Sequence, residues 1–427
     1  MGKADAALRK QALRRLRSGE KAATVAANCG VSESTVYRWR RESRRAATKS
    51  AVPVEGYVGD ITGPGITDKW GVTCTDLGVC AVAPNGKLVS VFGDTFSGPA
   101  VGKGDWRAPV ALIGSGDTNN RIRYESAGGA DADYAHQLWS YVHDGPPWSQ
   151  GGISTVIPSD LLVIGKTMYL HAIVNRGFGN VIWTGIWAST DNGVSWREMG
   201  AKATFPASLH DGYAQLWSWD YDPMDGWVYV VSTGFQRDKG IILRRVRPRH
   251  IGDLTKYSGW GWDGNQWAWG NAPTPITPPA ETWGELTLRR LETGTWILGG
   301  FLSSGYALGY RTLDSPTANL YEAEIQTPVV GTSWDAQDLA NNRVAQLYGG
   351  YILPSSRLDV QGGVGLVVSQ WDTATGWPYR AMQFRVTLKD TTAAARRPVA
   401  SGFGARRRRG RVHNVQRVLL LGRRDGV

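Results

Sequence analysis

Short β-forming runs rich in Val, Ile, Tyr and Trp recur along the chain, and Gly, Pro, Asn or Asp interrupts most of them. Typical runs are LVSVFGD (88–94), WVYVVST (227–233) and VGLVVSQW (364–371). Such segments predict many short antiparallel strands joined by tight turns, with few helices between them. We therefore expect a mainly β fold, built either as a sandwich or by radial repetition of small sheets.

Charge divides the 427 residues into three segments. The formal net charge is +11, but residues 1–50 and 391–427 each carry +9, which leaves −7 for the middle of the chain. An acidic middle segment is not expected to attract nucleic acid. We predict a small all-α basic segment at 1–48, a β domain at 52–390 and a basic, disordered tail at 391–427.

The basic N-terminal segment has a helical period interrupted by a turn. Gly30 is expected to end one helix and Ser32 to cap the next one. The run AANCGVSESTVYRW (26–39) resembles the helix-turn-helix of transposase-type and phage DNA-binding proteins, whose second helix enters the major groove. The resemblance implies an inner face made of Val31, Val36 and Trp39. It implies a DNA-facing set made of Ser34, Thr35, Arg38 and Arg41. A helical module for protein contacts is the alternative.

One motif favours radial repetition over a sandwich. STDNGVSW (189–196) fits the Asp-box pattern Ser-x-Asp-x-Gly-x-x-Trp, a hairpin turn common in sialidase-like propellers. In this pattern the Asp side chain binds the turn backbone and Gly adopts a positive φ. We expect a five-bladed β-propeller of about 65–70 residues per blade, and we assign Asp191 a structural role.

A tryptophan-rich hairpin is predicted at GWGWDGNQWAWG (259–270), with Asp-Gly at its turn. The four Trp residues lie at period two, so each strand places its pair on one face. Cross-strand packing of the indoles is one interpretation. A platform for stacking sugar rings is the other.

The remaining composition restricts the possible chemistry. The three Cys residues are too few for a disulfide framework. Cys74 and Cys80 are either a bridge between neighbouring strands or two buried thiols. The six His residues show no metal-ligand spacing, so we predict neither a catalytic metal nor a cofactor. No run is apolar and long enough to span a bilayer, and the polar, basic N-terminus lacks the apolar stretch expected of a secretory signal.

Two aspartates end apolar strands at positions where side chains of a propeller point into the central funnel. Asp76 follows GVTCT, and Asp94 follows LVSVFG, with an Asn-Gly turn between the two runs. The spacing places both acids at one end of neighbouring strands. Glycoside hydrolysis requires two carboxylates that flank the scissile bond, although Asp is also a routine turn residue.

Several segments, in order, resemble the actinobacterial and phage family that includes endo-D-arabinanases and was formerly catalogued as a domain of unknown function. The segments are GDITGPGITDKWGVTCTDLG (59–78), LVSVFGDTF (88–96), DWRAPVAL (105–112), WSWDYDP (217–223), WGELTLR (283–289), YGGYILP (348–354), VVSQW (367–371) and PYRAMQFR (378–385). Members are five-bladed propellers that cut the D-arabinan of mycobacterial arabinogalactan and lipoarabinomannan. The resemblance implies Asp76 and Asp94 as the catalytic pair, without deciding which one donates the proton.

The family pattern also implies substrate-binding positions. They are Trp106, Arg107, Glu285, Gln370 and Trp371. Arg107 either holds sugar hydroxyls or forms a structural ion pair, and Glu285 either raises the pKa of a catalytic Asp or ends a strand in solvent. Tyr348 and Tyr379 are expected to be packing residues.

The predicted function is an endo-D-arabinanase that acts on cell-wall arabinan and contacts DNA through its N-terminal helices. Because no signal peptide is evident, a phage origin would make it virion-associated or released on lysis. Two alternatives remain: a non-catalytic carbohydrate-binding phage tail protein, and a DNA-binding protein with a propeller as its sensor domain.

Overall fold

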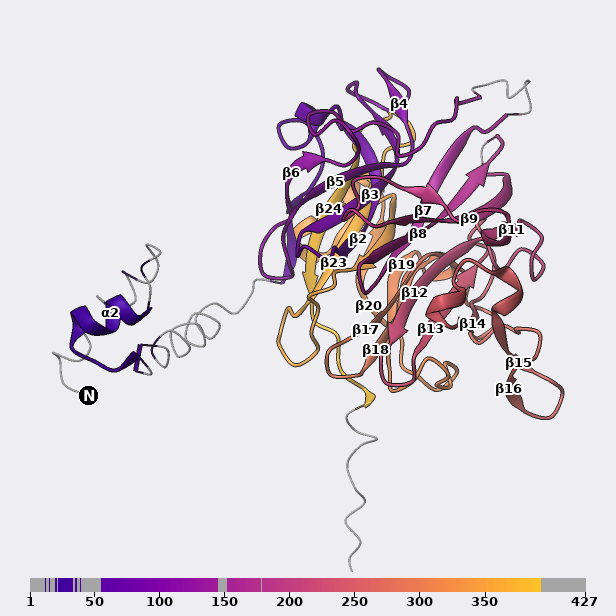
Figure 1. Ribbon diagram of the computed structural model, residues 1–427. Helices are drawn as coiled ribbons and strands as arrows, with labels where there is room; N and C mark the ends of the chain where they lie inside the picture. Colours follow the sequence, from indigo (N-terminus) through magenta and orange to yellow (C-terminus); the bar gives the residue numbers. More distant parts are fainter. Residues whose placement is uncertain are drawn as a thin grey trace, which may run out of the picture. The chain divides into compact units, whose positions relative to one another are not determined.

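The computed structural model describes residues 22–33, 35–36, 55–144, 152–177 and 179–392, together with the single positions 12, 15, 20 and 39. Within these residues the chain forms a five-bladed β-propeller and part of a small helical unit (Figure 1). No helix in the described ranges is apolar and long enough to cross a bilayer.

The described part of the helical unit contains α2 (Ala22–Cys29) and the turn that follows it. Gly30 has a φ of 63°, and Ser32 Oγ accepts a hydrogen bond of 3.2 Å from the Thr35 backbone, so the predicted break and cap are both confirmed. Val36 and Trp39 are buried against α2, as expected for the inner face. Of the predicted DNA-facing residues, Ser34, Arg38 and Arg41 lie outside the described residues. Thr35 is partly exposed, and its hydroxyl hydrogen-bonds Ser32 at 2.9 Å.

Each blade has an antiparallel core of strands that follow the chain from the centre outward, and the first two blades carry short added strands. The first contains β2 (Cys74–Val82), β3 (Leu88–Phe96), β4 (Trp106–Arg107), β5 (Val110–Ser115) and β6 (Arg123–Ala127). The second contains β7 (Thr155–Ile164), β8 (Thr167–Asn175), β9 (Val181–Ser189), β10 (Arg197–Glu198) and β11 (Thr204–Pro206).

The third and fourth blades have five strands each. The third contains β12 (Leu216–Asp222), β13 (Trp227–Thr233), β14 (Ile242–Val246), β15 (Ser258–Trp262) and β16 (Trp267–Trp269). The fourth contains β17 (Trp283–Arg290), β18 (Trp296–Leu302), β19 (Ala307–Leu313), β20 (Gln326–Thr332) and β21 (Arg343–Ala345), and β20 and β21 run parallel. Short 3₁₀ turns connect strands at 68–70, 201–203, 248–250, 254–256, 303–305, 334–336 and 339–341.

The fifth blade closes the ring because it combines both ends of the domain. It contains β22 (Leu347–Ile352), β23 (Val364–Trp371), β24 (Tyr379–Val386) and β1 (Gly56–Asp60). β1 pairs with β24, so the outer strand comes from the N-terminal end of the domain. The innermost strands β2, β7, β12, β17 and β22 contact one another in circular order. The predicted five-bladed propeller is therefore confirmed.

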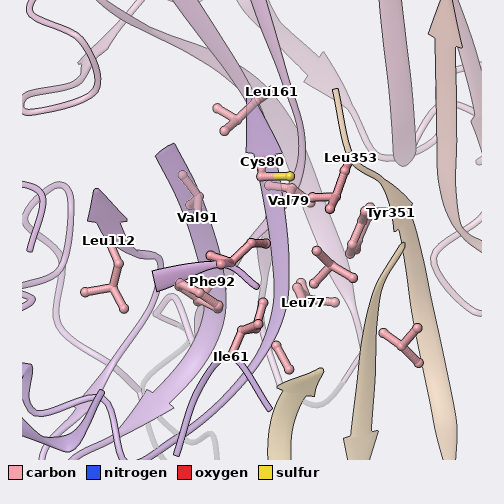
Figure 2. Close-up of a cluster of buried hydrophobic side chains, with 14 of the residues drawn as sticks. Ile61, Leu77, Val79, Cys80, Val91, Phe92, Leu112, Leu161, Tyr351 and Leu353 are labelled. Carbon is pink, nitrogen blue, oxygen red and sulfur yellow. The ribbon is translucent and has the colours of Figure 1, made fainter. Parts of the chain in front are cut away.

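The largest hydrophobic core surrounds β2 and joins four blades, the first, second, fourth and fifth. Figure 2 shows Leu77, Val79 and Cys80 of β2 beside Leu161 of β7 and Tyr351 of β22. Strands buried on both faces have nearly continuous apolar sequences, which explains why the inner strands show little alternation. Cys74 and Cys80 are both free and buried, so the buried-thiol interpretation is confirmed.

Candidate functional site

A cavity of about 760 Å³ opens at the end of the propeller where the five inner strands begin. Each inner strand contributes to the cavity wall a residue at or near its first position. These residues are Asp76, Thr155, Leu216, Glu285 and Leu347. Because every blade contributes, residues as far apart along the chain as Asp76 and Tyr379 line one cavity. The lining is mainly apolar, with a few carboxylates, which is typical of ligand sites in proteins.

A β-bulge places Asp76 on the cavity wall. The pairing of β2 with β3 shifts between Thr75 and Leu77, and Leu77 adopts a left-handed φ of 62°. Such a conformation costs of the order of 1–3 kcal/mol in a residue other than glycine. The Leu77 backbone is held by a 2.9 Å hydrogen bond to Ser369 on β23. Gly93 lies opposite the bulge, and a side chain there would collide with the Asp76 carboxylate, so the Gly-Asp sequence on β3 has a steric reason.

The Asp76 carboxylate is incompletely hydrogen-bonded. Oδ2 accepts a 2.9 Å bond from the Tyr348 hydroxyl, whereas Oδ1 is buried without a partner among the described residues. Burial raises the pKa of Asp76 to about 8, and the negative charge of Asp94 adds to the rise. Tyr379 and Tyr348 favour the ionised form and oppose this shift. Asp76 is thus protonated at neutral pH.

Asp94 has a different environment on the same wall. Its Oδ1 accepts hydrogen bonds from Trp106 Nε1 at 2.8 Å and from Thr155 Oγ1 at 2.5 Å. Burial raises the pKa of Asp94, while these two donors act in the opposite direction because they stabilise the carboxylate. The cavity therefore holds two neighbouring acids with different hydrogen-bond partners.

Glu285 supplies a third carboxylate, at the start of β17. One oxygen pairs with Arg237 at 2.5 Å, and the other is buried without a partner among the described residues. Arg237 also lies over the rings of Phe301 and Tyr348, at 5.2 and 5.1 Å from their centroids. The charge of Glu285 contributes to the raised pKa of Asp76, in agreement with the predicted third acid rather than with a solvated strand end.

The other predicted binding residues divide into two groups. Trp106 and Trp371 line the cavity together with Glu285. Arg107 does not, because its guanidinium binds the backbone carbonyls of Ala135 and Gly71 and pairs with Asp105 at 3.2 Å.

Gln370 also lies outside the cavity lining. It is fully buried, and its side chain binds the Ala345 carbonyl at 2.8 Å and accepts a 2.9 Å bond from Arg380. Arg107 and Gln370 therefore do not line the cavity, and their side chains bind nearby backbone carbonyls instead. Among the described residues, no group of three His, Cys, Asp or Glu side chains is arranged to hold a metal ion.

Several residues at the site were not identified from the sequence. Tyr348 and Tyr379 were expected only to pack, yet both line the cavity and act on Asp76. Thr155 and Arg237 lie in segments without a recognisable motif. Their positions depend on which blades become neighbours, and no local pattern contains that information.

The two other sequence motifs lie outside this cavity's lining. Asp191 occupies the turn between β9 and β10, where its Oδ1 accepts bonds from Ser189 Oγ at 2.7 Å and Ser195 N at 2.9 Å. In the hairpin of β15 and β16, Trp260 is opposite Trp269, with ring centroids 5.1 Å apart. Cross-strand indole packing is therefore present in the hairpin.

Comparison with known protein families gives separate matches for the propeller and for the N-terminal helical unit. Residues 62–385 match the family described as Domain of unknown function (DUF4185), and residues 3–47 match the Homeodomain-like domain. A Bacteroides ovatus protein described as a candidate hydrolase has a crystal structure that covers 78% of this chain and 90% of its own, with a TM-score of 0.53 and 13% identity. At that identity the likeness shows the fold alone.

Two curated relatives align with most of the chain. An uncharacterized 35.9 kDa protein in the asd 3′ region of Mycolicibacterium smegmatis is 30% identical over 347 residues, which is 77% of this chain and 97% of the relative. Notoamide biosynthesis cluster protein J′ of Aspergillus versicolor is 32% identical over 343 residues, which is 77% of this chain and 88% of the relative. The chain therefore belongs to the family that shares the domain of unknown function DUF4185.

Proposed function

We propose that the propeller is a glycoside hydrolase that cleaves internal D-arabinofuranosyl linkages of mycobacterial arabinogalactan or lipoarabinomannan. The observation that carries this proposal is the presence of Asp76 and Asp94 in one cavity with different hydrogen-bond partners. Two carboxyl groups on either side of a scissile bond are the requirement of glycoside hydrolysis. The arabinan specificity comes from the family resemblance of the motifs that contain both aspartates.

The two environments suggest different roles for the two acids. Asp76 has a pKa of about 8, so it holds a proton at neutral pH and can donate it to the departing glycosidic oxygen. Asp94 accepts hydrogen bonds from Trp106 and Thr155, which stabilise its ionised form. It then acts at the anomeric carbon, either as the base that removes a proton from the attacking water or as the nucleophile.

The cavity wall supplies flat apolar surfaces as well as carboxylates. Trp106 and Trp371 lie on the lining, and Tyr379 packs against Trp371 with ring centroids 5.5 Å apart. An aromatic ring fits the apolar face of a sugar. We assign these two Trp residues to holding furanose rings next to the acid pair.

Digestion of mycobacterial arabinogalactan by the full chain tests the proposal. We expect soluble oligosaccharides and new reducing ends, measured by chromatography and a reducing-sugar assay. The Asp94→Asn protein should release none while it keeps the wild-type melting temperature. Cleavage by Asp94→Asn at the wild-type rate would overturn the assignment.

A carbohydrate-binding phage tail protein is the second candidate, and the same digestion separates it from the enzyme. Such a protein would retain arabinan on a column but release no reducing ends. Under either candidate, we propose that the protein reaches the cell wall from a virion or after lysis. Immunodetection of the chain in purified particles and in lysates tests this location.

DNA contact by the N-terminal helices is a separate proposal, supported by the Homeodomain-like match and by the +9 charge of residues 1–50. A gel shift of the full chain, repeated over a range of salt concentrations, tests it. Specific binding would survive salt better than phosphate contacts alone. In the full chain, the double variant Arg38→Ala and Arg41→Ala should weaken the shift, and an unchanged shift would contradict the predicted DNA-facing set.

A further inference from the structure

A second hollow, of about 660 Å³, lies beside the cavity and shares Trp106 with it. It is formed by the strand β4 region, residues 105–107, and by the segment 136–143 that follows β6. It is more open to solvent than the cavity is. None of the motifs that suggested the catalytic pair lies in the segment 136–143.

A row of aromatic rings leads from the acid pair into this hollow. The Trp106 indole donates to Asp94, and its ring stacks on His143 with centroids 4.0 Å apart. His143 in turn meets the edge of Tyr141 at 4.9 Å. Trp106 also stacks on Phe96 of β3, so this row of contacting rings joins the surroundings of Asp94 to the hollow.

The hollow also offers polar groups. Asp105 and His136 expose 57% and 61% of their side chains, and Ser140 is exposed. His143 Nε2 is buried without a hydrogen-bond partner among the described residues, although its other ring nitrogen contacts the Ser154 carbonyl at 2.7 Å. Aromatic faces combined with a few polar groups are the usual means of binding a polar ring that has one apolar side.

Trp139 forms an aromatic wall of the hollow, and this wall is rigidly supported. Trp139 stacks almost parallel on Trp187, with centroids 4.2 Å apart and an interplanar angle of 5°. Trp187 belongs to β9 of the next blade and is buried. This wall is thus anchored to the second blade, so its shape is set before a ligand arrives and little ordering cost is added on binding.

We propose that the hollow is a glycosyl subsite that holds sugar residues of the polysaccharide beyond those in contact with Asp76 and Asp94. The inference rests on the proposed function and specifies how a chain-like substrate lies on the surface. A polysaccharide cut internally must extend past the cleavage point, and the continuity through Trp106 gives it a path on the Asp94 side. The hollow then contributes to the binding of long chains and not to that of the shortest ones.

The variant Ser140→Trp tests this inference by filling the hollow from an exposed position. The measured quantity is the ratio of kcat/KM for long arabinan chains to kcat/KM for the shortest arabino-oligosaccharide that is cleaved. We expect this ratio to fall about three- to tenfold, the range expected when an aromatic stacking contact is lost. His136→Ala, which changes another exposed side chain, should lower it in the same direction.

Met224→Trp is the matched control. Met224 is 82% exposed in the turn between β12 and β13, at the opposite end of its blade from Leu216, which lines the cavity. It receives the same new side chain and should leave the ratio unchanged. A Ser140→Trp protein with a wild-type ratio, or with equal losses on long and short substrates, would overturn the subsite.

A binding measurement separates the failure of this inference from the failure of the proposed function. In the Asp94→Asn background, calorimetry with arabino-oligosaccharides of increasing length should show affinity rising with length, and Ser140→Trp should abolish the rise. If Asp94→Asn still hydrolyses arabinan, the proposed function is wrong. If hydrolysis depends on Asp94 but Ser140→Trp leaves the length dependence intact, only the subsite is wrong.

Discussion

Asp76 and Asp160 both lie on inner strands of the propeller, but their surroundings differ in almost every respect. Asp160 on β7 is fully buried, and Arg289 binds it through both oxygens at 2.6 and 2.7 Å. Ser218 Oγ adds a 2.5 Å hydrogen bond, and the Leu161 backbone adds one of 2.8 Å. The group links three blades, because its members come from β7, β12 and β17.

Asp76 has no cationic partner of this kind in the part of the chain that the structure describes. One of its oxygens has no hydrogen-bond partner among the described residues. The charged residues that act on its pKa are the acids Asp94 and Glu285, and both raise it. In Asp160 both carboxylate oxygens accept hydrogen bonds, and removing its cationic partner would leave a buried charge uncompensated. A carboxylate surrounded by other acids is driven toward its protonated form instead. The same ring of strands thus contains one acid suited to structure and one suited to proton transfer.

Replacing Asp76, the proposed proton donor, should give the largest effect. In Asp76→Asn we expect kcat on arabinan to fall about 10²- to 10⁴-fold, because an amide cannot donate the proton. The melting temperature should not decrease, since the unpaired acid contributes no ion pair. Asp191→Asn, in the turn between β9 and β10, is the control and should keep its activity. Comparable losses of activity in both variants would contradict a role for Asp76 in proton transfer.

The opposite result is expected at the structural acid. Asp160→Asn leaves the buried Arg289 without its counter-charge, which costs about 3–5 kcal/mol of unfolding free energy. Urea denaturation followed by tryptophan fluorescence measures the loss. An Asp160→Asn protein as stable as wild type would remove the distinction between the two acids.

The pH dependence separates the two acids further. The pKa of Asp76 is about 8 in the folded protein and about 3.9 in the unfolded chain. The folded state therefore binds more protons between these values, and this group makes the protein less stable as the pH rises from about 4 to about 8. In Asp76→Asn this contribution should disappear. Thermal melts of both proteins across that range measure it, and parallel curves would contradict the raised pKa.

Two smaller changes should shift the basic limb of kcat/KM in opposite directions. Glu285→Gln removes a negative charge that raises the pKa of Asp76, so the limb should move to lower pH. Tyr348→Phe removes a hydrogen bond that lowers this pKa, so the limb should move to higher pH. Shifts in the same direction in both variants would assign the limb to another group.

The sequence indicated many of the strands, the number of blades and both aspartates. The run of residues from 74 to 96 already contained two strands, an Asn-Gly turn and two acids at their ends, and the structure has β2, that turn and β3 in this order. Local patterns succeed there because hairpins are formed by residues close in sequence. For Arg107 the local pattern left two possibilities open, a contact with sugar hydroxyls or a structural ion pair. The structure has the ion pair, with Asp105, and the guanidinium also binds the backbone carbonyls of Ala135 and Gly71.

By itself, the sequence determined the β-rich architecture, the helix-turn-helix break at Gly30 and the positions of Asp76 and Asp94 on neighbouring strands. These features depend on strand periodicity, turn chemistry and spacing along a hairpin, which are local. Only the tertiary structure decided that Tyr348, Thr155 and Glu285 surround the two acids. Closing five blades into a ring brings the starts of distant strands together, and the pKa of each acid depends on the partners found there.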